Sequence, residues 1–378
     1  MTITADALDR AAAWLMAWDG QGTHRTATAG DAAGAVWLAE MVTALGATPE
    51  FEEFALDRLD FGICRLEFDG AAIEAVPAFD APATGPDGIT GRLGGDIAVA
   101  ELSPRTVYSG EYQALRRDLH HRGLVIVCAG ETPGMALLNA EQFRQPYGAP
   151  AIHVASEARD RVLDAAARGA SARLVADSRR TRALAQNVIV SLPGRDTARP
   201  PLVVMTPRSS WWQSTAERGG GLVCWLETLR ALLAEPPLGP VILVATSGHE
   251  LGHLGLDDFV ERRPGYAHPL REGGAVWVHY GANIGAAGGN LSLMSASDDL
   301  RALAAAQLSG TPLDIAPKTA VPSGETRDIH RGGGAYLTLV GTSRLFHLPQ
   351  DRWPHAVDVA TIAGVASAAA RIVIALAR

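Results

Sequence analysis

The spacing of apolar residues divides this chain into alternating helices and strands. Helical spacing, with apolar residues recurring every three or four positions, extends over residues 5–18 and 29–46. Short strands are expected over 50–56 and 61–68. From about 70–110 the chain is rich in glycine, proline and aspartate with short apolar runs, which is typical of a β-rich or mixed segment.

The second half of the chain changes to longer alternating units. A βαβ rhythm leads into it, with helices expected around 111–121 and 156–169 and strands over 124–128 and 172–176. After Asn187, continuous apolar strands separated by helices are expected at Val188–Leu192, Leu202–Thr206, Val241–Thr246, Val276–Tyr280 and Ala335–Val340. Such strands predict an α/β fold with a mixed, mostly parallel sheet flanked by helices. In such sheets, ligands bind beyond the carboxyl ends of the strands.

Composition limits the class of protein. The 378 residues are 47% hydrophobic and 20% charged, which is typical of a globular chain of two or three domains. The net charge of −8 and the absence of a basic run argue against a nucleic-acid partner. The N-terminus lacks the features of a signal peptide, and the apolar C-terminal stretch, interrupted by Arg371, is expected to be a packed helix. Three widely spaced cysteines are expected to be buried thiols. We therefore expect a cytoplasmic protein without a membrane partner.

Candidate chemistry gathers just after the predicted strands. Imidazoles and carboxylates there suit a metal site or acid–base chemistry. The motif His249-Glu250-Leu251-Gly252-His253 has the HExxH spacing of a zinc metalloprotease. That motif belongs to a long regular helix, whereas here it follows a strand by two residues and contains a glycine, so the zinc metalloprotease interpretation is disfavoured.

A different similarity covers nearly the whole chain in order. Val241–Val260 resembles the segment of the family-28 zinc aminopeptidases in which a strand leads into a Glu-Glu-Leu-Gly turn. Residues 22–46, 187–194 and 346–351 resemble that family's first helix, a strand of its catalytic sheet and its closing segment. The resemblance implies a phosphorylase/hydrolase-like domain formed by 1–66 and 186–378. It also implies that 67–185 form an inserted, protease-associated-like domain that is smaller and β-rich.

The resemblance also implies an incomplete set of metal ligands. The family binds two zinc ions through a His-x-Asp pair, a bridging Asp, the second Glu of its Glu-Glu pair, a further Asp and a late His. In place of the His-x-Asp pair this chain has Pro207, Arg208 and Ser209. The ligand-type residues that remain are Glu217, Glu250 and His347, with His279 as a possible fourth ligand. The resemblance therefore implies one zinc ion per chain, as in the related glutaminyl cyclases.

His249 stands where the family has the Glu that activates water. An imidazole with an ordinary pKa of ~6.5 can accept a proton near neutral pH, so His249 is expected to be the catalytic base; the alternative is that it binds the metal. Arg208, Trp211 and Trp212 are expected to shape the substrate pocket. The alternatives are that Arg208 and Arg218 form structural ion pairs with Glu217 or Glu325, and that one tryptophan lies in the core. His253 is expected to be a core residue or a ligand.

The combined prediction is a hydrolase that acts on an amide or peptide-like bond of a small substrate. A homo-oligomer is compatible with the sequence. Two alternatives remain open. One is a metal-free homologue that acts as a binding or scaffold protein, and the other is a cyclase or lyase on the same fold.

Overall fold

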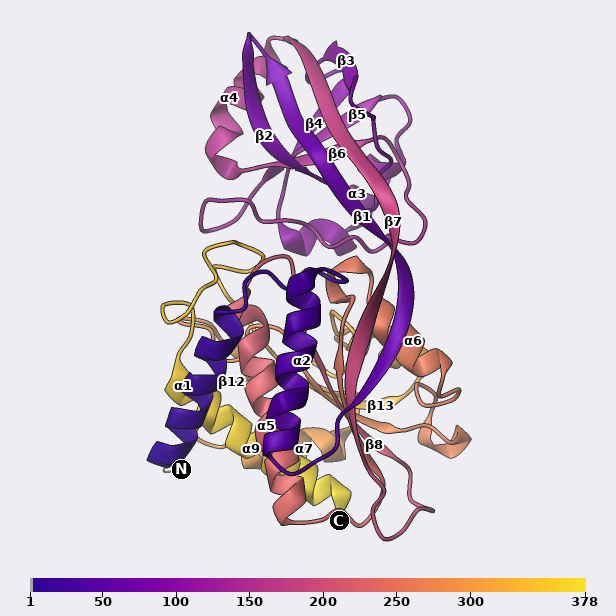
Figure 1. Ribbon diagram of the computed structural model, residues 1–378, viewed down its shortest axis with the longest axis vertical. Coiled ribbons are helices and arrows are strands. Elements are labelled where there is room, and N and C mark those ends of the chain that lie inside the picture. Colours follow the sequence, from indigo (N-terminus) through magenta and orange to yellow (C-terminus); the bar gives the residue numbers. More distant parts are fainter. Residues whose placement is uncertain (1–2) are drawn as a thin grey trace.

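Two very long strands join the two parts of the molecule (Figure 1). A computed structural model describes residues 3–378. β1 (Glu50–Phe68) and β7 (Ser171–Leu192) pair antiparallel along most of their length, and the register shifts between Phe61 and Cys64. The sequence predicted separate short strands here. That prediction was wrong because the strands continue through the irregularity, and each serves both parts of the molecule.

The larger part contains a mixed sheet. Its strands follow the order β12 (Leu313–Ile315), β11 (Leu291–Met294), β13 (Ala335–Gly341), β10 (Val276–Tyr280), β8 (Leu202–Pro207), β9 (Val241–Thr246), β7 and β1. The four central strands β13, β10, β8 and β9 are parallel to their neighbours within this group. Their carboxyl ends therefore meet at one edge, and the predicted α/β class is confirmed.

Helices cover both faces of this sheet. Successive residues of its strands point to opposite faces, and both sets of residues are apolar. Val188, Val204 and Leu243 face one core, whereas Ile189 and Val203 face the other. The first core is completed by helices α1 (Ala5–Asp19), α2 (Ala29–Ala44), α5 (Gly220–Ala234), α7 (Asp298–Gln307) and α9 (Val359–Ala377). The second is completed by α6 (Leu254–Glu261) and α8 (Thr326–Gly332).

The glycine run at the start of α5 lets this helix approach the sheet edge closely. A Cβ atom at Gly220 would lie 1.9 Å from the carbonyl oxygen of Ile284, and one at Gly221 would lie 2.6 Å from the hydroxyl of Thr206. Both distances are too short for any side chain. The run is thus explained by packing, and the residues just before it, including Glu217, are held against the strand ends.

The smaller part is built around the upper halves of β1 and β7. Its strands are β2 (Ala71–Pro77), β3 (Ile89–Arg92), β4 (Ile97–Leu102), β5 (Gly123–Cys128) and β6 (Ala151–Val154), and its helices are α3 (Gly110–Arg117) and α4 (Arg159–Ala167). They enclose their own apolar core. The predicted domain limits at residues 67 and 185 fall inside the two long strands. A short 3₁₀ helix, Pro104–Tyr108, faces the larger part.

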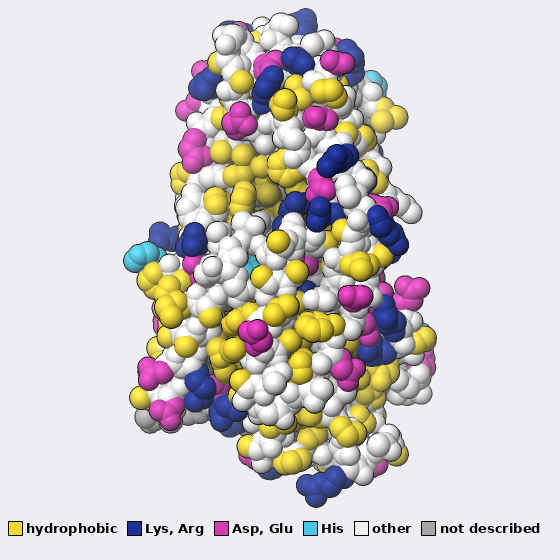
Figure 2. Space-filling model, viewed as in Figure 1, with side chains coloured by type: hydrophobic (Ala, Val, Ile, Leu, Met, Phe, Trp, Pro, Cys, Tyr) yellow, Lys and Arg dark blue, Asp and Glu magenta, His cyan; other side chains and the backbone are white. Residues whose placement is uncertain are grey.

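Helix α9 is the one described helix that is long and apolar enough to cross a membrane, with a mean hydropathy of 2.0. Half of the residues in that window are buried, and the helix packs against α5, α1 and α7. The three cysteines are free and buried, as predicted. On the face shown in Figure 2, basic and acidic side chains are intermixed.

Candidate functional site

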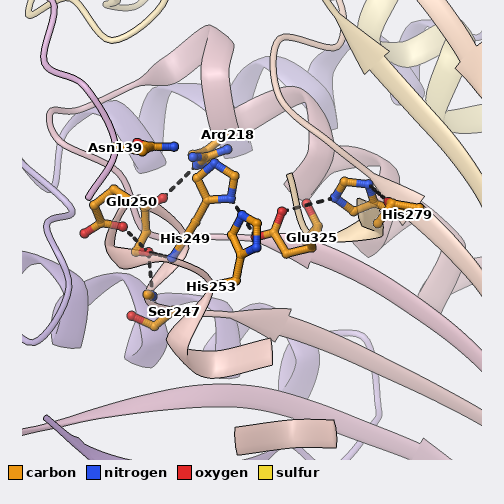
Figure 3. A network of polar contacts seen from close by, with 12 residues as sticks. Asn139, Arg218, Ser247, His249, Glu250, His253, His279 and Glu325 are labelled. Carbon is orange, nitrogen blue, oxygen red and sulfur yellow. Dashed lines mark hydrogen bonds and ion pairs between the residues drawn. The ribbon is translucent and has the colours of Figure 1, made fainter. Parts of the chain in front are cut away.

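Several buried polar side chains converge at the carboxyl ends of the central strands (Figure 3). The turn after β9 carries His249, β10 contributes His279, and the segment after β13 contributes His347. All three line one cavity of about 280 Å³. This is the sheet edge at which the sequence predicted a site.

The turn after β9 is irregular rather than helical. His249–Leu251 form one 3₁₀ turn, and Gly248, Gly252 and His253 have positive φ values of 86°, 81° and 65°. Helix α6 begins only at Leu254. The regular helix that the HExxH interpretation needs is therefore absent here. His249 and Glu250 are successive residues of the 3₁₀ turn, so their side chains point in different directions and meet different surroundings.

The carboxylate of Glu250 is enclosed by neutral donors. One oxygen accepts hydrogen bonds from the backbone N–H and the hydroxyl of Thr26, both at 2.7 Å, and the other accepts one from Ser209 at 2.7 Å. Burial raises the pKa of Glu250, and these hydrogen bonds only partly offset it. Glu250 does not line the cavity. The structure thus separates this expected ligand from His279 and His347.

Glu217 is paired with a guanidinium. Arg218 lies 2.7 Å from its carboxylate, and Nε2 of His347 lies 3.4 Å from the same oxygen. Burial alone would raise the pKa of Glu217, but the charges of Arg218 and His347 lower it to about 2. Asp351 accepts hydrogen bonds from the backbone N–H groups of Ala216 and Glu217 and fixes this turn. The structure thus forms the Arg218–Glu217 ion pair that was one of the alternatives predicted from the sequence.

The residues expected to shape a substrate pocket lie mostly inside the protein. Arg208 is fully buried, with one terminal nitrogen 2.7 Å from the carboxylate of Asp31, and it lies away from the cavity lining. Trp211 is buried against Phe79, with ring centroids 4.6 Å apart. Trp212 is partly buried and donates to the carbonyl oxygen of His347 at 2.9 Å. Trp212 thus supports a cavity residue without lining the cavity itself.

A cluster of two imidazoles and one carboxylate lies beside the cavity. Ligand atoms of His249, His253 and Glu325 all lie within 4.8 Å of one another. Nδ1 of His249 is 2.7 Å from Glu325. Nδ1 of His253 is 2.8 Å from Asp328, and its Nε2 is buried with no hydrogen-bond partner among the described residues. We call these three residues the histidine–glutamate cluster.

Charge in this cluster follows from its surroundings. Burial, together with the positive charge of Arg218, lowers the pKa of His249 to about 4, so its ring is neutral at pH 7. Burial would raise the pKa of Glu325, but the neighbouring histidines outweigh it and hold that pKa well below its usual value. Burial also opposes protonation of His253, yet its bond to Asp328 raises the pKa. A bound cation would compete with that proton.

His279 approaches the same carboxylate from the other side. Its Nε2 lies 3.6 Å from the second oxygen of Glu325. Its Nδ1 lies 2.6 Å from the hydroxyl of Thr326, which itself accepts a hydrogen bond from Thr338. The Thr326 proton can then point to Nδ1, which leaves the ring proton of His279 on Nε2, facing Glu325.

Glu325 and Asp328 were not predicted as site residues. Glu325 directly precedes α8, and Asp328 lies in the first turn of that helix. The sequence prediction relied on residues that follow strands, whereas α8 follows a loop. The signal available in the sequence was the spacing of Glu325 and Asp328, three positions apart at the start of a helix, which places both on one side of that helix.

The smaller part of the molecule closes one side of the cavity. Pro104, Arg105, Tyr108 and Asn139 come from it, whereas Asn283 and Phe346 come from the larger part. Arg327 of α8 pairs with Glu141 at 2.5 Å and stacks over the ring of Tyr108. The segment that carries Glu325 is therefore tied to the smaller part.

Solved structures with this architecture include a zinc aminopeptidase and other peptidases. The zinc aminopeptidase BSAP from Bacillus subtilis matches with a TM-score of 0.75 and 17% identity, covering 98% of this chain and 95% of that one. A peptidase M28 precursor from Shewanella amazonensis matches with a TM-score of 0.74 and 14% identity, covering 99% and 95%. This chain has the zinc exopeptidase fold. The aminopeptidase from Aneurinibacillus sp. strain AM-1 also matches, with a TM-score of 0.71 and 13% identity over 100% and 94% of the two chains.

Sequence comparison adds no family to this fold. No protein-family model matches the chain, and no curated protein matches it. At these identities the structural likeness establishes the fold alone, and the chemistry depends on the chain's own side chains.

Proposed function

We propose that this protein is a metal-dependent hydrolase of amide bonds that holds one zinc ion in the histidine–glutamate cluster. The observation that carries this proposal is the cluster itself, since two imidazoles and one carboxylate are a ligand set of catalytic zinc sites. Asp328 at Nδ1 of His253 supports it, because ligand histidines are commonly oriented by a carboxylate at the other ring nitrogen.

The cluster fits a cation better than the ligand set implied by the sequence resemblance. Nε2 of His253 and one oxygen of Glu325 are buried without hydrogen-bond partners among the described residues, and both are donor atoms that zinc accepts. In the other set, both oxygens of Glu217 and Nε2 of His347 also lack hydrogen-bond partners among the described residues. That set differs because the oxygens of Glu250 are already hydrogen-bonded, and because the guanidinium of Arg218, 2.7 Å from Glu217, would repel a cation there. We therefore place His249 among the ligands and leave the role of base to another residue.

His347 is the residue that we propose as proton acceptor. Its Nδ1 lies 2.6 Å from the carbonyl oxygen of Leu137. In the neutral form of the ring, the proton is therefore on Nδ1, and Nε2 is the nitrogen that can accept a proton. The side chain lines the cavity, and Glu217 lies 3.4 Å from Nε2, where its charge would stabilise the protonated ring.

The reaction that these groups support is hydrolysis. Zinc, when bound, would polarise the substrate carbonyl and acidify water. His347 would take a proton from water as the water oxygen bonds to the carbonyl carbon, and would return that proton to the nitrogen as the C–N bond breaks. Asn139 and Asn283 line the same cavity and can hydrogen-bond to the substrate amide.

Metal analysis of variants tests the proposal. Protein purified without added metal and then supplied with one equivalent of zinc should retain about one ion per chain. His253→Ala and Glu325→Gln should each lower zinc affinity by about 10-fold or more, because each removes a ligand. Glu250→Gln and His347→Ala should retain zinc, and His347→Ala should lose hydrolysis.

Two results would contradict this proposal. A wild-type protein that retains no zinc would point to the metal-free binding protein instead. Zinc retained by both His253→Ala and Glu325→Gln but lost from Glu250→Gln would restore the ligand set implied by the sequence resemblance. Circular dichroism spectra and melting temperatures would show whether each variant is folded.

A further inference from the structure

A second cavity lies directly beside the first, between the smaller and larger parts of the molecule. It has a volume of about 890 Å³ and shares Pro104, Arg105 and Phe346 with the cavity at the histidine–glutamate cluster. A ligand that enters through the larger cavity would pass Arg105 before it reaches the cluster. Selectivity for substrate charge can therefore be set at this shared boundary.

Positive charge predominates in the lining of the larger cavity. Arg105 comes from the smaller part and Arg344 from the segment after β13, and both are exposed. Neither has an ion-pair partner among the described residues, in contrast to Arg327, which pairs with Glu141. Glu131 is the one acidic residue in the described lining, so two guanidinium groups face one carboxylate.

The smaller cavity offers little to a substrate with a free amine. Glu325 is the one carboxylate in its described lining, and this group already bonds to His249 and lies near His279. Glu217 lies behind the lining and is paired with Arg218. A substrate ammonium would thus meet Arg105 and three histidines without an available carboxylate, which is an unfavourable electrostatic environment.

We propose that the substrates are amides that carry a carboxylate on the amine side and no free amine, that is, N-acylated amino acids or N-blocked peptides. This inference rests on the proposed hydrolase function. The acyl group occupies the smaller cavity, whose lining includes Phe346 and Val340. The substrate carboxylate lies between Arg105 and Arg344, because a guanidinium can donate two parallel hydrogen bonds to a carboxylate.

A matched pair of small ligands tests this charge preference without requiring turnover. N-benzoylglycine carries a carboxylate, and its amide, N-benzoylglycinamide, has the same shape without the charge. Calorimetric titration of the zinc-loaded His347→Ala variant, which should hold zinc without hydrolysing the ligand, should show binding of N-benzoylglycine about tenfold or more tighter than binding of the amide. In this background, Arg105→Gln and Arg344→Gln should each reduce N-benzoylglycine affinity about tenfold and leave binding of the amide unchanged.

Arg271→Gln is the control, since Arg271 is exposed and lies outside both cavity linings. It should change neither affinity. Equal affinity of His347→Ala for the two ligands would overturn the inference. So would N-benzoylglycine binding that stays equally tight when Arg105→Gln and Arg344→Gln are both added to that variant. If the wild type holds zinc in these experiments, such a result leaves the hydrolase proposal standing. Failure to hold zinc is the separate result that removes that proposal.

Discussion

Buried carboxylates in this molecule differ in what compensates their charge. Glu250 is surrounded by neutral donors, and burial raises its pKa. Burial raises the pKa of Asp351 to about 7, although two backbone N–H groups bond to it. Burial also acts on Asp19, but hydrogen bonds from Arg352 and Thr215 outweigh it and lower the pKa. The pKa of a buried carboxylate in this protein therefore depends on its hydrogen-bond and ion-pair partners as well as on its burial.

Asp19 gives a prediction about acid stability. Its carboxylate accepts two hydrogen bonds from Arg352 at 2.9 Å and one from the backbone of Trp353. Because the folded-state pKa lies below the unfolded value of ~3.9, the stabilisation is present above that pH and is lost as the pH falls through the folded pKa. Asp19→Asn should lower the free energy of unfolding by about 1–3 kcal/mol at pH 7. Urea denaturation at pH 7 and below pH 4 would show this difference shrinking in acid; an undiminished difference would contradict it.

Elements of regular structure were largely predictable from the apolar pattern, and their irregularities were not. The strands after Asn187 and the long helices match their predicted positions closely, because continuous apolar runs and helical spacing carry that information. The sequence did not predict that four short strands join into β1 and β7. The polar residues between those predicted strands indicated turns, but in the structure β1 and β7 pair with each other through these residues. The sequence also left Glu325 out, because its role depends on where α8 docks.

The turn between β9 and α6 gives a prediction at this scale. Gly252 has a φ of +81°, and a Cβ atom there would lie 2.9 Å from the carbonyl oxygen of Glu141. Gly252→Ala should therefore cost about 1–3 kcal/mol of stability and weaken zinc binding, because this turn orients His249 and His253.

Gly273→Ala is the matched control, since Gly273 has a φ of +84° with no atom near its Cβ position. It isolates the cost of the backbone conformation. If Gly252→Ala is no more destabilising than Gly273→Ala in thermal denaturation, the contact with Glu141 has no role in holding this turn.

The two parts of the whole molecule act together at the cavity. The smaller part supplies Arg105 and Tyr108 to its lining, while Glu141 holds α8 through Arg327. The sequence resemblance implied an inserted domain, but a sequence pattern contains no information on how an insert docks. The cavity wall that it forms follows from contacts between residues more than 180 positions apart.

Glu141→Gln should loosen this link. The Arg327–Glu141 pair is largely buried, so its weakening should cost about 1–3 kcal/mol and increase amide hydrogen exchange in 104–108 and 323–332. Glu272→Gln, which weakens the exposed Arg271–Glu272 pair, should change exchange in neither segment. Unchanged exchange in both segments of Glu141→Gln would show that the two parts are held together by other contacts.

The position of the metal ion tests the central claim most directly. Crystals grown with one equivalent of zinc, measured on both sides of the zinc absorption edge, would locate the ion by anomalous scattering. We predict a single peak in contact with His249, His253 and Glu325. A peak beside Glu217, Glu250 and His347, or no peak in zinc-loaded crystals, would contradict it.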